Sequence, residues 1–389
     1  MSAQADAMKR SFVRSMTLIA TAAFGLESVV KREVTDLGFD DIKCIDSRVE
    51  FASGNIHEAI VRSNLWLRSA DRVLLKMAEF KATDFETLFE QTKALPWDDW
   101  ITKDGKFTVT AKTHKSGLSS EPAIQKIVKK AVADRLQQKY KVNWFDETGP
   151  EYTIQAAFLK DIVTLTIDTT GVRNGLHKRG YRAKSNDAPI KETMAAALIS
   201  LSRWNGRHGK KTFLDPCCGS GTLPIEAAML ARNIAPGLAR KSACEFWPQI
   251  DAKLWKDARM DAYAQINHEI EPEIYASDID PKAIELAQAN AELAGVDDCI
   301  IFENKPVKEL RLPASTGVAI INPPYGERLG AIKEAEALYA DLGNLFNPSK
   351  WNVYVITPDE FFETSYKRKA KAKRKLFNGM IKTDYYQYF

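Results

Sequence analysis

The sequence predicts an α/β protein in which an open, mostly parallel sheet follows two smaller α+β modules. The chain of 389 residues is longer than one hydrophobic core usually serves, so we expect more than one domain. After residue 206, short hydrophobic runs alternate strictly with helical patterns, which indicates parallel strands with helices on both faces of the sheet. We expect its strands at residues 212–215, 274–278, 299–302, 317–321 and 352–356.

The first 165 residues show a more mixed pattern. We expect strands at 16–24, 73–80, 106–111, 152–158 and 162–167, and helices at 85–95 and 121–140. Residues 16–24 resemble a weak signal peptide, but Thr17 and Thr21 interrupt the apolar run, which favours a buried strand. Near the other end of the chain, Asn378-Gly379 between hydrophobic residues predicts an antiparallel hairpin.

Composition is that of an ordinary globular protein. Hydrophobic residues make up 45% of the chain and charged residues 27%. The longest apolar runs fall short of the roughly 20 residues that span a bilayer. The five cysteines are odd in number, and neither they nor the five histidines show metal-ligand spacing. We therefore expect a cytoplasmic protein with reduced thiols, no metal and no membrane partner.

Basic residues are concentrated in two runs, although the net charge is only +4. Residues 367–375 contain seven basic side chains, and residues 173–184 add six Lys, Arg or His without an acid. A single run of this kind is usually a solvated face. Two runs that flank a candidate site indicate a polyanion partner. The predicted contacts are Lys178, Arg179, Arg182, Lys367, Arg368, Lys369 and Lys371.

A glycine turn between a strand and a helix occupies residues 215–222. Its glycines let a ligand approach the backbone, and the acid at the strand end can accept hydrogen bonds from a cationic or hydroxylated group. Pro224 replaces the third glycine of a dinucleotide fingerprint and no Walker lysine is present, so pyrophosphate binding is not favoured. The predicted contacts of a bound cofactor are Asp215, Cys217, Gly219, Ser220, Gly221 and Thr222.

A second strand ends at Asp278. An acid at this position is the expected partner of ribose hydroxyls, so Asp278 and its neighbour Ile279 are also predicted cofactor contacts. Asp280 precedes a proline and is interpreted as a helix cap. Residues 232–272 separate this strand from the glycine turn, and we interpret them as an insertion that either covers the site or contacts the substrate.

The most informative motif is Asn322-Pro323-Pro324-Tyr325, which comes directly after the strand at 317–321. The Asn322 side-chain oxygen and the Pro323 carbonyl can accept both protons of an exocyclic amine, held still by two ring-restricted residues. Tyr325 can stack on an extruded base. A rigid proline turn is the simpler interpretation, but the glycine turn and Asp278 upstream favour a catalytic group that transfers a methyl to such an amine. Asn322 is also expected to face the cofactor.

These motifs resemble those of class I S-adenosylmethionine-dependent methyltransferases that modify exocyclic amines. Nearly the whole chain is similar to THUMP-domain RNA methyltransferases of the bacterial 23S rRNA guanine type, that is, RlmL and the stand-alone YpsC-like proteins. The resemblance rests on residues 23–27, 176–182, 188–193, 215–221 and 322–329.

The resemblance implies a ferredoxin-like module at residues 1–66, a THUMP RNA-binding domain at 67–168 and a Rossmann-like methyltransferase domain at 169–389. It implies S-adenosylmethionine as the methyl donor and S-adenosylhomocysteine as the product. The acceptor it implies is the 2-amino group of a guanine in 23S rRNA, free or in a ribosome assembly intermediate. A second methyltransferase domain, present in some relatives, is not expected.

Two details of the implied cofactor site leave alternatives. Residues 303–306 replace an acid that commonly faces the cofactor's adenine, and Asn304 is the candidate for that contact. Pro189 and Thr193 belong to a segment that the resemblance places over the cofactor, and that is equally well explained as an ordinary helix start.

Other functions fit the same residues. The tetrapeptide suits the 6-amino group of adenine equally well, and a guanine in transfer RNA is a rival acceptor. A non-enzymatic alternative is an RNA-binding ribosome assembly factor with a vestigial site, against which the intact glycine turn argues.

Overall fold

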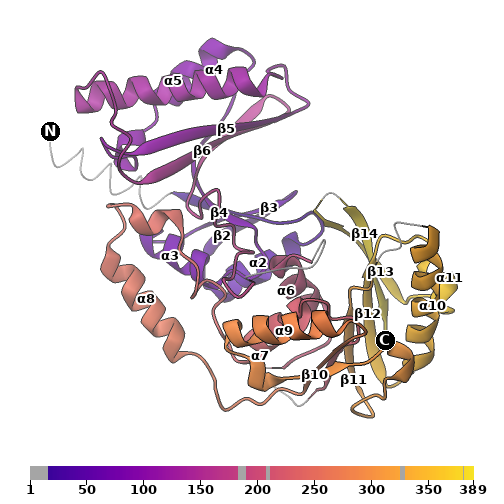
Figure 1. Ribbon diagram of the computed structural model, residues 1–389. Coiled ribbons are helices and arrows are strands. Elements are labelled where there is room, and N and C mark those ends of the chain that lie inside the picture. Colours follow the sequence, from indigo (N-terminus) through magenta and orange to yellow (C-terminus); the bar gives the residue numbers. More distant parts are fainter. Residues whose placement is uncertain (1–15, 183–189, 207–210, 325–328, 380) are drawn as a thin grey trace. The chain divides into compact units, whose positions relative to one another are not determined.

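The computed structural model describes residues 16–182, 190–206, 211–324, 329–379 and 381–389, which form two compact units (Figure 1). The first unit contains the chain up to residue 21 together with 31–176 and 241–259, and the second contains 22–30, 177–240 and 260–389. The domain boundaries expected after residues 66 and 168 stay predictions. The units differ from those domains mainly in residues 241–259, which belong to the first unit.

The first unit is built on a seven-stranded sheet of order β2-β3-β1-β4-β7-β6-β5. β5 and β6 are parallel, and the other neighbours are antiparallel. The strands are β1 (Thr17–Thr21), β2 (Asp40–Ile45), β3 (Arg48–Ala52), β4 (Arg72–Lys81), β5 (Lys106–His114), β6 (Glu151–Leu159) and β7 (Ile162–Asp168). The two expected modules therefore share one sheet, because the long strand β4 pairs with β1 on one side and β7 on the other.

The helices of the first unit pack on this sheet. They are α2 (Glu27–Asp36), whose first residues belong to the second unit, α3 (Ile56–Trp66), α4 (Phe85–Lys93) and α5 (Glu121–Tyr140). Figure 1 shows α4 and α5 lying along β5 and β6. α5 begins after Ser120, whose hydroxyl accepts from the Ala123 N–H at 3.4 Å, and ends at Lys141 in the left-handed region. The predicted helix at 121–140 is confirmed.

The second unit holds a seven-stranded sheet of order β10-β9-β8-β11-β12-β14-β13. Its strands are β8 (Phe213–Asp215), β9 (Ile274–Asp278), β10 (Ile300–Asn304), β11 (Gly317–Ile321), β12 (Trp351–Thr357), β13 (Ala372–Asn378) and β14 (Ile381–Tyr388). β8 to β12 are parallel, and β14 is antiparallel to β12 and β13. The five predicted strands and the hairpin are confirmed. Asn378, expected in the turn, is instead the last residue of β13 and pairs with Ile381.

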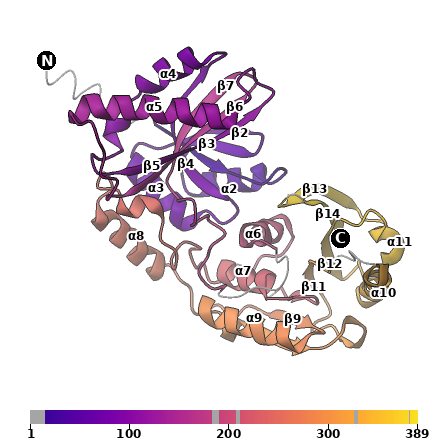
Figure 2. The ribbon, with the colours of Figure 1, turned by 45° about the horizontal axis from the view of Figure 1, so that its top comes forward.

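Helices cover both faces of this second sheet (Figure 2). α6 (Glu192–Leu201), α7 (Thr222–Ala231) and α9 (Pro281–Ala294) pack on one face, and α10 (Leu329–Leu345) and α11 (Phe362–Tyr366) pack on the other. Strand β11 is buried throughout, because Val318 and Ile320 face the first helical layer while Ala319 and Ile321 face the second. This two-sided burial explains why the strand is a continuous hydrophobic run rather than an alternating one.

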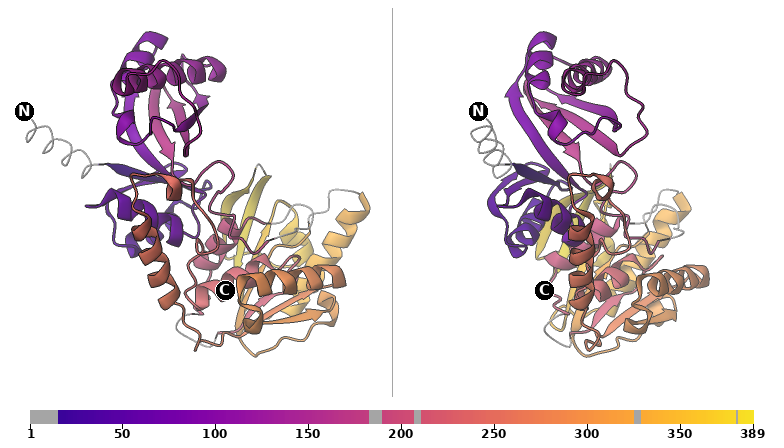
Figure 3. Two further views of the ribbon diagram at one scale, coloured as in Figure 1. Left: turned by 60° about the vertical axis from the view of Figure 1, so that its left-hand side comes forward. Right: turned by 90° about the vertical axis from the view of Figure 1, so that its left-hand side faces the viewer.

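The predicted insertion after α7 contributes to the first unit. Its residues 241–259 include a short helical turn, η2 (Ala243–Phe246), and most of α8 (Ala252–Ala264). Figure 3 shows this coral segment beside the purple elements of the first unit. Trp247 anchors it: the ring is buried, stacks on Tyr152 with centroids 4.9 Å apart, and donates from Nε1 to the Glu151 carbonyl at 3.1 Å.

Candidate active site

The glycine turn connects β8 to α7 and is held from the side by α9. Gly219 and Gly221 have positive φ angles of 52° and 80°. A Cβ atom at Gly221 would lie 2.9 Å from the Cβ of Ala287, so the close packing of α9 excludes a larger residue. The Asn290 side-chain amide donates to the Ser220 carbonyl at 3.0 Å. The turn is therefore fixed before any ligand binds.

Asp215 and Asp278 end neighbouring parallel strands, and both carboxylates hold the backbone of this edge. Asp278 accepts from the Gly219 N–H at 2.9 Å and from the Asp280 N–H at 3.0 Å. Asp215 accepts from the Cys217 N–H at 3.2 Å. Asp280 caps α9, as predicted, by accepting from the Lys282 N–H at 2.9 Å.

Asp215 is a buried acid that lacks a cation. Its side chain is enclosed, and in the described part of the chain no cationic side chain pairs with it. Burial raises the pKa of the Asp215 carboxyl well above its usual range; the Cys217 N–H opposes this rise, and the charge of Asp278 adds to it. An ammonium group beside Asp215 would satisfy the acid. A carboxylate also has acceptor sites beyond the two that Asp278 uses, so these residues fit the amino acid and ribose parts of the expected cofactor.

Asn304, the candidate adenine contact, has a structural task. It ends β10 opposite Asp278, and its side-chain nitrogen donates to the carbonyls of Asp278 at 2.9 Å and of Ile279 at 3.0 Å. Asn304 thus fixes the backbone that presents Ile279, whose side chain is 71% exposed. Direct contact of either residue with adenine stays a prediction.

The Asn-Pro-Pro motif lies at the same edge of the sheet as the glycine turn. β11 pairs with β8 on one side and with β12 on the other, so Asn322 leaves the sheet next to the end of β8. Asn322 is half-buried, Pro323 is buried and Pro324 is exposed. Two predicted site residues, Pro189 and Tyr325, lie outside the described residues. The adjacency of these strand ends is the arrangement that the predicted chemistry requires.

Arg179 and Arg182, predicted to contact RNA, have partners inside the second unit. Arg179 is 3% exposed and lies with its Nε 3.2 Å from Oε1 of Glu226, which also accepts from the Tyr181 hydroxyl at 3.1 Å. The prediction for Arg179 is wrong, because a desolvated guanidinium with a carboxylate partner presents no charge to RNA.

Arg182 connects the start of α6 to the glycine turn. It donates to the Ile190 carbonyl at 3.0 Å and to the hydroxyl of Thr222, and its Nε lies 3.5 Å from the carboxylate of Glu192. Burial raises the pKa of Glu192, while the charge of Arg182 opposes this. Thr193 is the next residue in the first turn of α6 and is buried. These contacts place the start of α6 beside the first residue of α7, so Arg182 supports the turn rather than offering a free cation.

The second basic run divides into exposed and engaged side chains. Lys367, Lys369 and Lys371 are exposed, as is Lys178 of the first run. Arg368 is half-buried and donates to the Phe346 carbonyl, which makes it a structural residue. RNA contact by the exposed lysines stays a prediction.

Phe361 is a residue of this edge that sequence reasoning missed. It lies shortly after β12, the strand next to β11, and its side chain is 76% exposed although the adjacent Phe362 is buried in the core. The Phe361 N–H donates to the Asp359 carboxylate at 2.8 Å, and the Tyr386 hydroxyl donates to the Asp359 carbonyl at 3.2 Å. The available signal in the sequence was the Phe-Phe pair just after a strand.

The described residues form neither a candidate metal site nor a membrane-spanning helix. No group of three or more His, Cys, Asp or Glu side chains there could hold a metal ion. Among the described helices, none combines the length and the apolar character needed to cross a bilayer.

The sheet order, the glycine turn after β8, the acid after β9 and the Asn-Pro-Pro motif after β11 define a class I S-adenosylmethionine-dependent methyltransferase. The chain belongs to the RMKL-like methyltransferase family, whose methyltransferase domain matches residues 179–387. The RlmL ferredoxin-like domain matches residues 17–74, and the THUMP domain matches residues 82–168. The family that the motifs resemble is thereby confirmed.

Similar proteins cover the whole chain. "Putative RNA methyltransferase YpsC" of Bacillus subtilis is 47% identical over 97% of both chains. The ribosomal RNA large subunit methyltransferase K/L of Psychromonas ingrahamii is 33% identical over 92% of this chain and 48% of its own, so this chain spans about half of that enzyme. A Listeria monocytogenes protein described as a predicted N6-adenine-specific DNA methylase has a crystal structure that superposes with a TM-score of 0.91, 45% identity and 98% coverage of both chains.

A further solved structure bears on the cofactor. SMU.472, a methyltransferase crystallised with S-adenosylhomocysteine, superposes with a TM-score of 0.89 at 43% identity, over 96% of this chain and 98% of its own.

Proposed function

We propose that this protein transfers a methyl group from S-adenosylmethionine to the 2-amino group of a guanine in 23S ribosomal RNA. The observation that carries the proposal is the adjacency of Asn322-Pro323 and the glycine turn at neighbouring strand ends. The names of YpsC and of the K/L enzymes, and the THUMP domain, support RNA as the substrate. A cytoplasmic location and ribosomal RNA, free or in an assembly intermediate, are parts of the same proposal.

The cofactor supplies an electrophilic methyl group when bound. Asp215 would accept hydrogen bonds from its ammonium group, and Asp278 would accept them from its ribose hydroxyls. The positive φ angles of Gly219 and Gly221 shape the turn beside it, and the contact of Gly221 with Ala287 keeps α9 packed against that turn. The burial of Asp215 without a cationic partner among the described residues supports this assignment, since such an acid is costly to keep unless a ligand uses it.

The acceptor amine is held by the neighbouring strand end. The Asn322 side-chain oxygen and the Pro323 carbonyl accept hydrogen bonds from its two N–H groups, which directs the nitrogen lone pair out of the ring and toward the methyl group. When the N–C bond forms, the S–C bond of the donor breaks, and the methylated nitrogen then loses one proton to solvent. Both acceptors are rigid, because Pro323 and Pro324 restrict the backbone that carries them. The chain contributes alignment and hydrogen bonding rather than a nucleophile.

The nucleoside formed in vitro tests this proposal. The purified protein is incubated with methyl-labelled S-adenosylmethionine and 23S rRNA from cells that lack it, and the digested nucleosides are separated and identified by mass. We expect N2-methylguanosine at one position of the RNA. N6-methyladenosine would instead support the adenine alternative, which the description of the Listeria protein favours. If the protein methylates transfer RNA and not 23S rRNA, transfer RNA replaces 23S rRNA as the proposed substrate.

Cofactor binding separates the enzyme from the non-enzymatic alternative. Calorimetry with S-adenosylhomocysteine is expected to show one binding site per chain. If the protein binds RNA but neither binds this ligand nor methylates any RNA, an assembly factor with a vestigial site is the better description.

Loss of the Phe361 ring is expected to weaken the use of RNA. Its exposed ring comes shortly after β12, the neighbour of the strand that carries the Asn-Pro-Pro motif, and stacking of a base on an aromatic side chain contributes about 1 to 3 kcal/mol. Phe361→Ala should therefore raise KM for RNA at least about 5-fold, while Phe361→Tyr stays near wild type. Steady-state kinetics measure this. An equal effect of Tyr263→Ala, which removes an exposed ring from α8, would mean that Phe361 has no specific role.

Neutralising the exposed lysines of the second basic run is expected to reduce the salt dependence of RNA binding. Each phosphate contact adds about 0.7 to 0.9 to the slope of log K against log salt, so Lys367→Gln, Lys369→Gln and Lys371→Gln together should lower it by up to about 2.7. Binding titrations at several salt concentrations give the slope. Arg368→Gln is the control, because its engaged side chain should affect stability and leave the slope unchanged. An unchanged slope in the triple variant would mean that these lysines form a solvated surface that does not contact RNA.

A further inference from the structure

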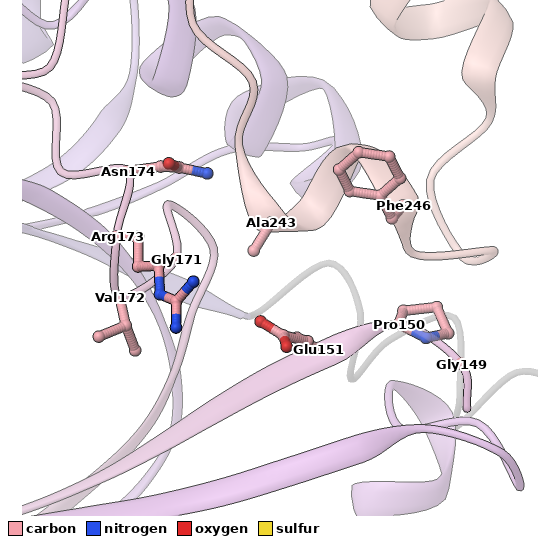
Figure 4. Close-up of a pocket in the computed structure, with 9 residues that line it drawn as sticks. All are labelled: Gly149, Pro150, Glu151, Gly171, Val172, Arg173, Asn174, Ala243 and Phe246. Atoms are coloured by element: carbon pink, nitrogen blue, oxygen red, sulfur yellow. The ribbon is translucent and has the colours of Figure 1, made fainter. Parts of the chain in front are cut away.

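The first unit contains a pocket of about 610 Å³ that none of the predicted site residues lines (Figure 4). Three segments of the chain form it: the start of β6 with the two residues before it, the loop after β7, and η2 of the insertion. The lining residues are Gly149, Pro150, Glu151, Gly171, Val172, Arg173, Asn174, Ala243 and Phe246. Its volume is in the range of pockets that bind small organic ligands.

The backbone of the insertion is bonded directly to the loop after β7. The Ala243 and Cys244 N–H groups donate to the carbonyls of Thr170 and Thr169, both at 3.1 Å. Gly171 lies against the insertion with a φ of 96°, and a Cβ atom there would be 2.9 Å from the Cβ of Ala243. Contact this close leaves no room for a side chain at position 171, so the two segments form one wall of the pocket.

Buried side chains reinforce the same junction. Asn64 donates to the Thr169 hydroxyl at 2.9 Å and accepts from the hydroxyls of Thr170 at 3.1 Å and Ser242 at 3.3 Å. The Arg72 guanidinium donates to the carbonyls of Gly171 at 2.8 Å and Val172 at 2.9 Å. The pocket is therefore organised before a ligand enters, which lowers the entropy cost of binding.

The side chains at the pocket combine apolar surface with one cation and one acid. Phe246 and Val172 are 60% and 59% exposed, so their apolar surfaces are open to a ligand. Figure 4 shows the guanidinium of Arg173 and the carboxylate of Glu151 pointing toward each other across the pocket, with Phe246 on the far side from Arg173. Lys106 lies 3.4 Å from Glu151 and offsets part of its charge, so the Arg173 charge remains available to an anion.

We propose that this pocket binds one unpaired nucleotide of the RNA substrate. The base stacks on Phe246, Arg173 contacts a phosphate, and Glu151 accepts a hydrogen bond from a base amino group or a ribose 2′-hydroxyl. The inference rests on the proposed RNA substrate and adds a second point of contact in a unit that carries no catalytic residue. The sequence left two interpretations of the insertion, a cover over the site or a contact with the substrate. The proposal favours the contact with the substrate.

Matched variants test the pocket in the full chain with 23S rRNA from cells that lack the protein. Phe246→Ala is expected to raise KM for this RNA at least about 5-fold, and Phe246→Trp to restore it. Arg173→Ala should raise KM and lower the salt slope of RNA binding by about 0.7. The dissociation constant of S-adenosylhomocysteine and kcat should stay within about twofold of wild type. Tyr263→Ala and Arg311→Ala remove an exposed ring and an exposed cation outside the pocket and should change nothing.

Photocrosslinking gives a readout that does not depend on catalysis. RNA transcribed with 5-iodouridine is irradiated with the protein, and the crosslinked peptides are identified by mass. We expect a crosslink within residues 242–253 that disappears in Phe246→Ala. Circular dichroism of the variant confirms that it is folded, since removing an exposed ring should cost little stability.

The possible outcomes separate the pocket from the proposed function. Normal methylation with unchanged KM in both variants, and crosslinks only elsewhere, would overturn the pocket and leave the function intact. A variant that methylates naked RNA normally but ribosomal particles poorly would point to a protein partner and also overturn it. Failure of the wild-type protein to methylate any RNA, with the expected crosslink present, would remove the proposed function and keep the pocket.

Discussion

Asn322→Ala is expected to lower the rate of methyl transfer by about 10²- to 10³-fold, the effect of deleting other preorganised hydrogen-bonding groups at reacting centres. The affinity for S-adenosylhomocysteine should change less than about threefold, because Asn322 acts on the acceptor amine in this mechanism. Single-turnover assays at saturating RNA measure the rate, and calorimetry measures the affinity. The Pro323 carbonyl remains in the variant, so a small residual rate is also expected.

Two companion variants make the Asn322 result interpretable. Asn322→Asp keeps an acceptor oxygen at the same place and should retain more activity than the alanine variant. Asn304→Ala removes the side chain that holds the Ile279 backbone, so it should weaken cofactor binding more than it slows the transfer step. Parallel loss of rate and of cofactor affinity in Asn322→Ala would contradict the assignment of Asn322 to the amine.

Asp215→Asn is expected to weaken S-adenosylmethionine binding by about 10- to 100-fold and to stabilise the ligand-free protein. The loss of affinity results from removing a charged acceptor, whose hydrogen bonds typically contribute about 1.5 to 3 kcal/mol. The gain in stability results from burial, since the wild-type protein holds a carboxylate out of water that no cation in the described part of the chain pairs with. Calorimetry and thermal unfolding measure the two effects.

The pH dependence of stability has a definite sign. Burial raises the pKa of Asp215 in the folded protein, so the folded state holds this proton more tightly than the unfolded state. Below the ordinary pKa of an aspartic acid, Asp215 is protonated in both states and does not lower the free energy of unfolding. As pH rises from there to the raised pKa, Asp215 lowers the free energy of unfolding increasingly. Above that window the Asp215→Asn variant should unfold at a higher temperature than wild type, and the difference should vanish at low pH.

The proton of Asp215 should also affect the pH dependence of cofactor binding. An ammonium beside Asp215 favours the ionised acid, so affinity should increase as pH rises through the raised pKa, and binding should release a proton below it. Calorimetry in buffers of different ionisation enthalpy measures this release. Asp280→Asn is the matched control: Asp280 is an exposed helix cap and asparagine caps a helix about as well, so the substitution should change stability little and leave the proton release unchanged. Wild-type binding without any pH dependence would contradict the assignment of Asp215.

Local patterns were sufficient for the catalytic sheet. Strands β9 and β11 were predicted with their observed bounds, and β11 is the continuous apolar run expected of a parallel strand that is covered on both faces. The carboxyl ends of parallel strands lie at one edge of a sheet, and this brings Asp215, Asp278 and Asn322 together. The predictions of position therefore succeeded where the place of a residue depends on its own element and on the direction of its strand.

Other features depend on partners that are distant in the sequence. Arg179 lies in a basic run that looks like a solvated surface in the sequence, and only the folded structure pairs it with Glu226. Phe361 and Phe362 have the same side chain, but the first is exposed and the second is buried. Likewise, local hydrophobic spacing says which face of a helix or strand is buried, but not by which partner. Packing between segments far apart in the chain therefore decided that residues 241–259 belong to the first unit. The same packing formed the pocket that these residues share with Gly171 and Glu151.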